Sequence, residues 1–284
     1  MTREWQLLVK TAAGKLQQAG IERPYREASL LWCGVSGQDL SQWILYGGSL
    51  SSSLVEEYRL AIKRRVAREP FHYIIGVREF MGLNFHVDPR VLIPRPETEQ
   101  LVERILTDAD KRALLIADVG TGSGAIAISL VYFGHFEWRV MAIDVSEEAL
   151  SVAKLNGANL LKNRGHIDFV QGDLLTDILE PVDIVAANLP YVTEEGDQEY
   201  FPELSYEPRI ALYAPDGGLK TILRLIKQLP SRLKAGGRVY LEVGGGQAAR
   251  VEQCLTAQGL VILPRTHDLA RIDRVVAAEK PLGE

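Results

Sequence analysis

The spacing of apolar residues changes along the chain, and the change predicts two structural parts. Up to about residue 75, apolar positions recur every three or four residues, which is typical of amphipathic helices. The first stripe begins at Leu7 and is expected to end at Gly20. No strand pattern follows, so residues 1–75 are expected to form a small helical domain. Three later helices have start signals, a proline or a polar cap: Pro24, Asp39 or Ser41, and Ser53 followed by Glu56.

The last of these helices ends in a cluster of basic residues. Such a cluster either complements the partial negative charge of a helix C-terminus or contacts an acidic or RNA-bearing partner. The helical part carries no other visible chemistry, so its expected role is to recognise or position a partner. The basic residues are Lys63, Arg64, Arg65 and Arg68.

The segment after residue 75 has a different pattern. Apolar and polar residues alternate between residues 80 and 87, which predicts a hairpin with its turn near Met81-Gly82. Two prolines then bracket Arg95 and stiffen an extended strap. The strap is either a simple linker or a device that holds Arg95 and Glu97 near a site.

Beyond residue 100, short apolar runs alternate with helical patterns. The alternation predicts an α/β fold with a doubly wound, mostly parallel sheet and a closing hairpin at one edge. Residues 192–216 lack clear periodicity and are interpreted as a loop or lid. The expected domains are 1–75 (helical), 76–99 (hairpin and linker) and 100–284 (α/β). The expected strands are 114–119, 139–143, 167–170, 182–187, 238–242, 261–263 and 273–278.

Polar side chains stand at the ends of four predicted strands. They are Asp118, Asp144, Asp173 and Asn188. Open α/β sheets bind ligands at the carboxyl ends of their strands. We therefore expect these four residues to meet at one edge of the sheet, and this agreement in position is stronger evidence than any single motif.

A glycine-rich turn follows the first of these strands and indicates a cofactor. Its spacing matches neither GxGxxG nor GxxxxGK[ST]. Asp118, just before the turn, suits the cationic amino group of a methionyl moiety, and Asp144 is placed to accept both ribose hydroxyls. Asp173 or Leu174 would reach the adenine. The set fits S-adenosylmethionine, with a purely structural turn as the alternative. The turn consists of Gly120, Thr121, Gly122, Ser123 and Gly124.

The four residues after the 182–187 strand form a candidate clamp for a flat, nitrogen-bearing group. The Asn188 side-chain oxygen can accept one N–H and the Leu189 carbonyl another, which would orient the nitrogen towards an electrophile. Pro190 stiffens the backbone, and Tyr191 offers a face for stacking. Methyl transfer to a nitrogen held in this way needs no strong base, because the proton can leave after the nitrogen has become cationic. An ordinary strand-end turn is the alternative.

Composition narrows the classes of function that remain. The 284-residue chain has a net charge of −5, which gives no general attraction to nucleic acid or to anionic membranes. No apolar run is long enough to cross a bilayer and no signal-peptide core is present, so we expect a cytoplasmic protein. Cys33 and Cys254 have no CxxC partner and are expected to be buried thiols. The five histidines do not cluster at metal-ligand spacing, so no metal is expected.

These motifs together resemble a known family, the protein-(glutamine-N5) methyltransferases that modify peptide-chain release factors (the HemK/PrmC family). The resemblance covers nearly the whole chain. The strap and the Glu207-Pro-Arg segment are far more specific than the glycine turn, which most methyltransferases share. The matching segments are 69–76, 91–99, 118–126, 188–191, 207–212 and 268–276.

The resemblance implies a Rossmann-like, seven-stranded class I methyltransferase domain and a helical domain that helps to dock the release factor. The implied reaction moves a methyl group from S-adenosylmethionine to the glutamine of the Gly-Gly-Gln tripeptide in class 1 release factors, which modulates translation termination. By position, residues 120–124, Asp144, Leu174 and Asn188 would contact the cofactor, and residues 188–191 would hold the glutamine amide. The enzyme is expected to be a monomer that does not contact nucleic acid directly.

Two features depart from the family pattern. The family usually reads Asn-Pro-Pro-Tyr at the clamp, whereas this chain has Leu189. The carbonyl survives the change and Pro190 still restrains the backbone, so we expect the geometry to hold. Residues 244–247 read Gly-Gly-Gly-Gln and thus contain the target tripeptide itself. A glycine-rich turn is the expected interpretation there, with self-methylation as the alternative.

Three other functions stay open on sequence grounds. Similar clamps serve glutamine methylation of a ribosomal protein and adenine-N6 methylation of DNA. A DNA substrate would require base flipping and a basic groove, which the negative net charge disfavours. The third is a non-catalytic protein that binds S-adenosylmethionine, with Leu189 marking the lost activity.

Overall fold

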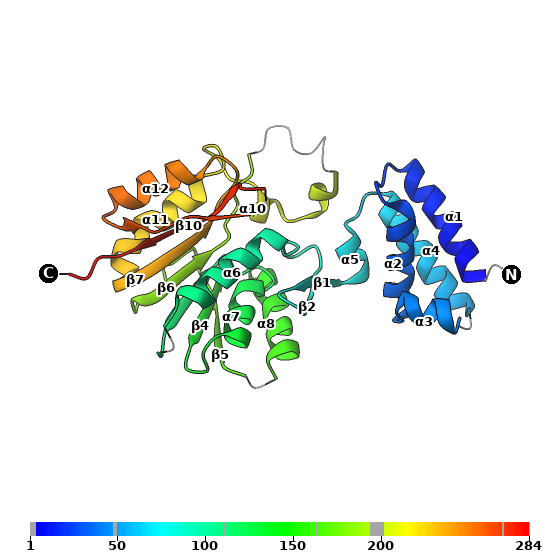
Figure 1. The fold of residues 1–284 in the computed structure, drawn as a ribbon, viewed down its shortest axis with the longest axis horizontal. Helices are drawn as coiled ribbons and strands as arrows, with labels where there is room; N and C mark the ends of the chain where they lie inside the picture. The colour runs from blue at the N-terminus through cyan, green and yellow to red at the C-terminus, as the bar shows by residue number, and fades with distance from the viewer. Residues whose placement is uncertain are drawn as a thin grey trace. The chain divides into compact units, whose positions relative to one another are not determined.

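The chain forms two compact units, Met1–Val77 with Gln198–Tyr206, and Arg78–Asp197 with Glu207–Glu284. The structure is a computed structural model that describes residues 4–47, 50–110, 112–162, 164–193, 202–268 and 270–283. Each unit has its own hydrophobic core, and Figure 1 shows the elements of both. Among the described residues, every helix is too short or too polar to span a membrane.

The expected helical region is confirmed. Its centre is Trp32, which packs edge-on against Trp43 and Tyr58 with ring centroids 5.0 and 5.1 Å away. The Tyr58 hydroxyl donates to the Ala28 carbonyl and so ties the last long helix to the second. The α-helices are α1 Glu4–Gln18, α2 Pro24–Ser36, α3 Leu40–Leu45, α4 Ser52–Val66 and α5 Phe71–Ile75.

Two details of this unit differ from the sequence-based expectation. The cap of α4 is Ser51, whose hydroxyl accepts the Leu54 N–H at 3.1 Å, so the prediction of Ser53 was wrong. The basic end of α4 has partners within its own unit. Arg65 is buried and contacts Glu27 at 2.7 Å and Glu203 at 3.0 Å. These ion pairs occupy Arg65, which is therefore not a docking contact for an outside partner.

The second unit contains the expected doubly wound sheet. The strand order is β5-β4-β3-β6-β7-β10-β8, and β9 pairs with β10. The strands from β5 to β7 are parallel and β10 runs antiparallel to β7, as expected for an antiparallel edge. The short β9 makes the sheet eight-stranded rather than seven-stranded. Its strands are β3 Leu115–Val119, β4 Arg139–Asp144, β5 His166–Gln171, β6 Val182–Ala187, β7 Leu233–Glu242, β8 Val261–Ile262, β9 Thr266–His267 and β10 Asp273–Glu279.

Alternate residues of the central strands feed two apolar layers, because successive side chains of a strand point to opposite faces. In β6, Val185 packs into the layer that contains α11 and α12, whereas Ile184 packs into the layer that contains α6 and α7. Figure 1 shows these helices on the two faces of the sheet. The helices are α6 Pro96–Asp108, α7 Ala125–Phe133, α8 Glu147–Leu161, α11 Lys220–Arg232 and α12 Ala248–Ala257.

The connecting segments contain the expected hairpin and two short helices that the sequence did not predict. The predicted hairpin is present as β1 Val77–Phe80 and β2 Leu83–His86, with positive φ at Met81 (52°) and Gly82 (72°) in its turn. Part of the expected loop or lid, residues 194–201, lies outside the described residues. The rest contains a 3₁₀ helix, Pro202–Tyr206, and a one-turn helix, α10 Arg209–Leu212, so the expected loop or lid is partly helical where the structure describes it. Helices this short leave no periodic signal in a sequence.

The two cysteines are free thiols, as expected, but both are partly exposed rather than buried.

Candidate active site at the carboxyl edge of the sheet

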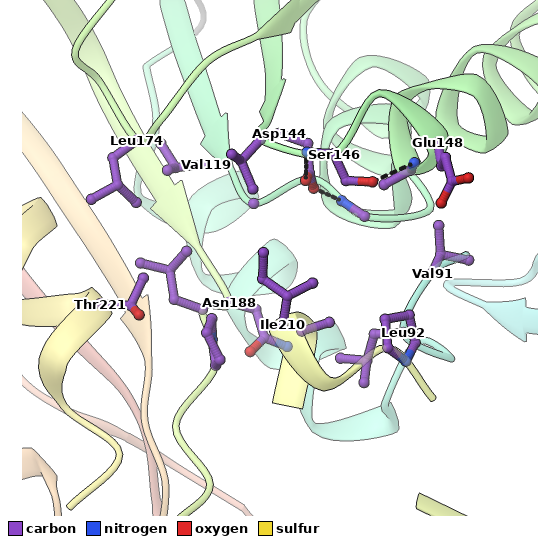
Figure 2. Close-up of a pocket in the computed structure, with 18 of the residues that line it drawn as sticks. Val91, Leu92, Val119, Asp144, Ser146, Glu148, Leu174, Asn188, Ile210 and Thr221 are labelled. Atoms are coloured by element: carbon purple, nitrogen blue, oxygen red, sulfur yellow. Dashed lines mark hydrogen bonds between the residues drawn. The ribbon is translucent and has the colours of Figure 1, made fainter. Parts of the chain in front are cut away.

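A cavity of about 420 Å³ opens where β3, β4 and β6 end. Figure 2 shows Val91, Leu92 and Ile210 around the same cavity as Asp144 and Asn188. Its walls therefore come from the strand ends, from the strap after the hairpin and from the segment that contains α10. This is the edge at which sequence reasoning placed the site.

Most of the predicted site residues line this cavity. They are Gly120, Gly122, Asp144, Asp173, Leu174, Asn188, Leu189 and Pro190. The others lie behind the wall rather than in it. They are Asp118, Thr121, Ser123, Gly124 and Tyr191.

The glycine turn brings the backbone close to the cavity. Gly120 and Gly122 have positive φ values, 74° and 53°, which residues other than glycine rarely adopt. A Cβ on Gly120 would lie 2.9 Å from the Leu189 side chain, so the turn and the clamp pack directly together. Asp144 fixes the turn from the next strand, since its Oδ2 accepts the Gly122 N–H at 2.9 Å and its Oδ1 accepts the Ser146 N–H at 2.9 Å. Burial raises the pKa of the Asp144 carboxyl.

Asp118 lies beneath the glycine turn and is fully buried. Its Oδ2 accepts the Thr121 hydroxyl at 2.6 Å and the Ala127 N–H at 3.1 Å. Its Oδ1 is buried and no hydrogen bond from a described residue reaches it. Loss of hydration raises the pKa of this carboxyl to about 7. A buried, unsatisfied acceptor beside the turn fits a cationic amine, so the residues present are chemically suited to a methionyl cofactor.

Asn188 stands at the cavity wall with a fixed side chain. It directly follows β6, and its Nδ2 donates to the Thr98 hydroxyl at 2.9 Å. This bond sets the plane of the amide and leaves Oδ1 as the acceptor for a ligand N–H. Pro190 lines the cavity beside it, and the Leu189 side chain is buried in the core.

Tyr191 does not line the cavity, and its position is fixed by a hydrogen bond to Glu242. Its ring is partly buried, and its hydroxyl donates to the Glu242 carboxylate at 3.3 Å. Burial and the charge of Glu242 raise the pKa of Tyr191 well above its usual value. The Gln247 Nε2 also donates to the Tyr191 carbonyl at 3.0 Å. The groups that fix the clamp are therefore Thr98, Glu242 and Gln247, and sequence reasoning gave none of them this role. The sequence did contain a signal for Glu242, because this residue ends a predicted strand at the same edge of the sheet as Asn188.

The strap is fixed by an ion pair between Arg95, which is partly exposed, and the buried carboxylate of Glu207. Glu207 accepts the Arg95 guanidinium at 2.6 Å and the Ile93 N–H at 3.1 Å, and its side chain is only 2% exposed. The bonds join the strap to the segment that carries Pro208 and Ile210, which line the cavity. The strap is thus part of the site and not a simple linker. Among the described residues, the His, Cys, Asp and Glu side chains form no group suited to a metal ion.

Both the helical part and the α/β part of the chain match families of known proteins. A family model described as the PrmC N-terminal domain matches residues 8–76, and one described as a methyltransferase domain matches residues 116–205. The chain is 35% identical to the release factor glutamine methyltransferase of Lactococcus lactis, over 92% of this chain and 96% of the relative. It is 36% identical to the enzyme of the same name from Bradyrhizobium diazoefficiens, over 95% and 93%.

Solved structures show the same fold at lower identity. A methyltransferase from Pyrococcus furiosus is 16% identical and superposes with a TM-score of 0.54 over 80% of this chain and 98% of that one. A 16S rRNA N2 G1207 methyltransferase from T. thermophilus, solved with AdoMet and guanosine, is 18% identical with a TM-score of 0.51 over 72% and 49%. The second unit therefore has a class I methyltransferase fold.

Proposed function

Because the chain belongs to the release factor glutamine methyltransferase family, we propose that it methylates N5 of the glutamine in the Gly-Gly-Gln tripeptide of class 1 release factors. The enzyme is an S-adenosylmethionine-dependent methyltransferase. The observation that carries the substrate proposal is the Asn188 amide, fixed by Thr98 at the wall of the cavity. The other candidate substrates, a ribosomal protein and DNA, have no comparable support.

We assign the cofactor to the half of the cavity that Gly120, Gly122, Asp144 and Leu174 line. S-adenosylmethionine supplies a methyl group made electrophilic by the sulfonium. Asp144 would hold the ribose hydroxyls, the free oxygen of Asp118 would attract the amino group, and Leu174 would pack on the adenine. Gly120 and Gly122 have no side chain, so the backbone of the turn can approach the cofactor closely, and glycine also tolerates the positive φ of these positions.

We assign the substrate amide to the Asn188 half. The Asn188 Oδ1 accepts one N–H of the glutamine amide and the Leu189 carbonyl accepts the other. These bonds orient the nitrogen and stabilise the positive charge that develops on it, so its proton leaves after the N–C bond forms. Leu189 does this through its carbonyl, so replacing the usual proline keeps the acceptor.

The helical unit is proposed to dock the release factor. Residues 8–76 match the PrmC N-terminal model, which supports a role shared across the family. We further propose a monomeric enzyme that acts in the cytoplasm, where release factors work, without contacting nucleic acid directly.

Isotopically labelled S-adenosylmethionine and an unmethylated release factor test the proposal. Peptide mass spectrometry is expected to locate the label on the tripeptide glutamine. A release factor with that glutamine replaced by alanine is the matched control and is expected to stay unlabelled. Label on any other residue, or none at all, would overturn the substrate assignment.

A further inference from the structure

The turn after β7 contains the Gly-Gly-Gly-Gln sequence, and the structure gives its glutamine a use. Gln247 Oε1 accepts the Gly244 N–H at 2.9 Å, and Nε2 donates to the Tyr191 carbonyl at 3.0 Å and to the Gly217 carbonyl at 2.9 Å. Both N–H groups of the amide are occupied, so this conformation does not offer Gln247 as a methyl acceptor. The glutamine instead joins three segments at the end of the clamp.

Two glycines allow this close approach to Tyr191. A Cβ on Gly218 would collide with the Tyr191 carbonyl oxygen, and a Cβ on Gly244 would lie 3.1 Å from the Tyr191 ring. Side chains at these positions would push Tyr191 out of place. The backbone around Tyr191 is therefore packed for one position of that residue.

Glu242, at the end of β7, contacts the other end of Tyr191. Its side chain is buried, with the residue only 1% exposed, and its Oε1 accepts the Tyr191 hydroxyl at 3.3 Å. Thr98, Glu97 and Arg274 are the other groups that face it. Burial raises the pKa of this carboxyl to about 7. The proposed transfer reaction uses neither Glu242 nor Gln247 directly, so the cost of burying a carboxyl here calls for another role.

We propose that Glu242 and Gln247 are positioning residues for Tyr191 and thereby set the geometry of the amide clamp. Gln247 fixes the Tyr191 backbone and Glu242 fixes its phenol. Asn188 and Leu189, which would bind the substrate amide, lie three and two residues before Tyr191 in the same rigid segment. The inference rests on the proposed function, because it requires a substrate amide in the clamp.

Gln247→Met tests the backbone contact, since methionine has a similar length but no donors. We expect the KM for the release factor to rise about tenfold, because all three hydrogen bonds of the Gln247 side chain are lost. The dissociation constant of S-adenosylmethionine is expected to stay within about twofold, because Gln247 does not line the cavity. Gln228→Met is the matched control. Gln228 accepts the Leu175 N–H at 2.8 Å away from Tyr191, and its loss should leave the release factor KM unchanged.

Glu242→Gln tests the phenol contact through pH. In the wild type, the single-turnover rate is expected to rise as pH increases through about 7, because the ionised carboxyl accepts the Tyr191 hydroxyl more strongly. The amide of Glu242→Gln keeps an acceptor but does not titrate. The rise of the single-turnover rate near pH 7 should therefore disappear in this variant. Adding Glu242→Gln to Tyr191→Phe should change the rate no further, because the phenol contact is already gone.

The outcomes separate this inference from the proposed function. If the wild type transfers no label to a release factor, the proposed function and the inference both fail. If the wild type is active but Gln247→Met keeps the wild-type KM, or Glu242→Gln keeps the wild-type pH profile, only the inference fails. Thermal unfolding of every variant checks the fold. A variant whose affinity for S-adenosylmethionine falls as its release factor KM rises would contradict a role confined to the clamp.

Discussion

Asp118 and Glu242 lie on β3 and β7, the two strands that flank β6. Burial raises the pKa of each carboxyl to about 7, and each has one buried oxygen that no described residue bonds. Asp118, however, bonds its own turn and the following helix through Thr121 and Ala127. Glu242 bonds Tyr191, which comes from a different segment of the chain.

The same difference separates the two halves of the site as a whole. The cofactor half is held by bonds between residues that lie closer in the chain, from Asp118 to Thr121 and from Asp144 to Gly122, over 3 and 22 residues. The Asn188 half is held by Thr98, 90 residues away in the chain. A damaged clamp should therefore impair methyl transfer without loosening the cofactor, and a damaged glycine turn should do the reverse.

The largest separation is expected for Asn188→Ala. Loss of the side-chain acceptor should lower the rate of methyl transfer by about 10²–10³, as removal of one oriented hydrogen-bonding group does in other active sites. Cofactor affinity should fall far less than the rate, although Asn188 is also expected to contact the cofactor, because the glycine turn and Asp144 keep their own bonds. Single-turnover kinetics and calorimetry of cofactor binding measure the two quantities. Near wild-type turnover would mean that Asn188 does not orient the substrate.

The pH dependence of stability gives the next largest effect. The pKa of Glu242 is raised from 4.5 to about 7 in the folded protein, so the native state keeps its proton longer than the unfolded state. The contribution of Glu242 to the free energy of unfolding should be largest below about pH 4.5. It should fall by up to about 3 kcal/mol as pH rises from there through 7. Urea unfolding at several pH values should show this loss reduced in Glu242→Gln. Glu57→Gln, on the exposed surface of α4, should leave it unchanged.

Asp144→Asn should weaken cofactor binding without affecting the clamp. Both carboxylate oxygens accept backbone N–H groups, and asparagine can replace only one of them. We expect the dissociation constant of S-adenosylmethionine to rise about 10–100-fold, as for a lost hydrogen bond to a charged group. Asp173→Asn is the matched comparison. That side chain is exposed and already pairs with Arg224, so a change below about threefold is expected.

Thr98→Val should give the smallest effect, on the clamp alone. Valine keeps the shape of threonine but cannot accept the Asn188 N–H, so the Asn188 amide can rotate. The transfer rate should fall about tenfold with cofactor affinity unchanged. Thr98→Ser retains the hydroxyl and should retain the rate. Equal rates for the valine and serine variants would rule out Thr98 as the group that orients Asn188.

Local geometry explains which parts of the site the sequence predicted. A glycine turn is dictated by neighbouring residues, and the strand-end rule places Asp144 and Asn188 from the strand pattern alone. The Thr98 and Gln247 contacts depend on the tertiary fold, because their partners lie 90 and 56 residues away. A glycine-rich turn was the expected interpretation of residues 244–247, with self-methylation as the alternative. The hydrogen bonds of Gln247 to Gly244, Tyr191 and Gly217 favour the structural role over the alternative.

The same limit applies to the fold. Seven strands were predicted, but β9 has only two residues, Thr266 and His267, and exists through its pairing with β10. The basic end of α4 carried no sign that Arg65 pairs with Glu203, 138 residues away. Periodic elements were thus predictable, whereas short elements and distant pairs were not.

The central claim, that the clamp binds both N–H groups of the target amide, can be measured by NMR. The sample is a release factor labelled with ¹⁵N on its glutamine side chains, bound to the enzyme and to unreactive S-adenosylhomocysteine. Both amide protons of the tripeptide glutamine are expected to shift downfield, and one of the two shifts should be lost with Asn188→Ala. Two unshifted protons in the wild-type complex would contradict the account.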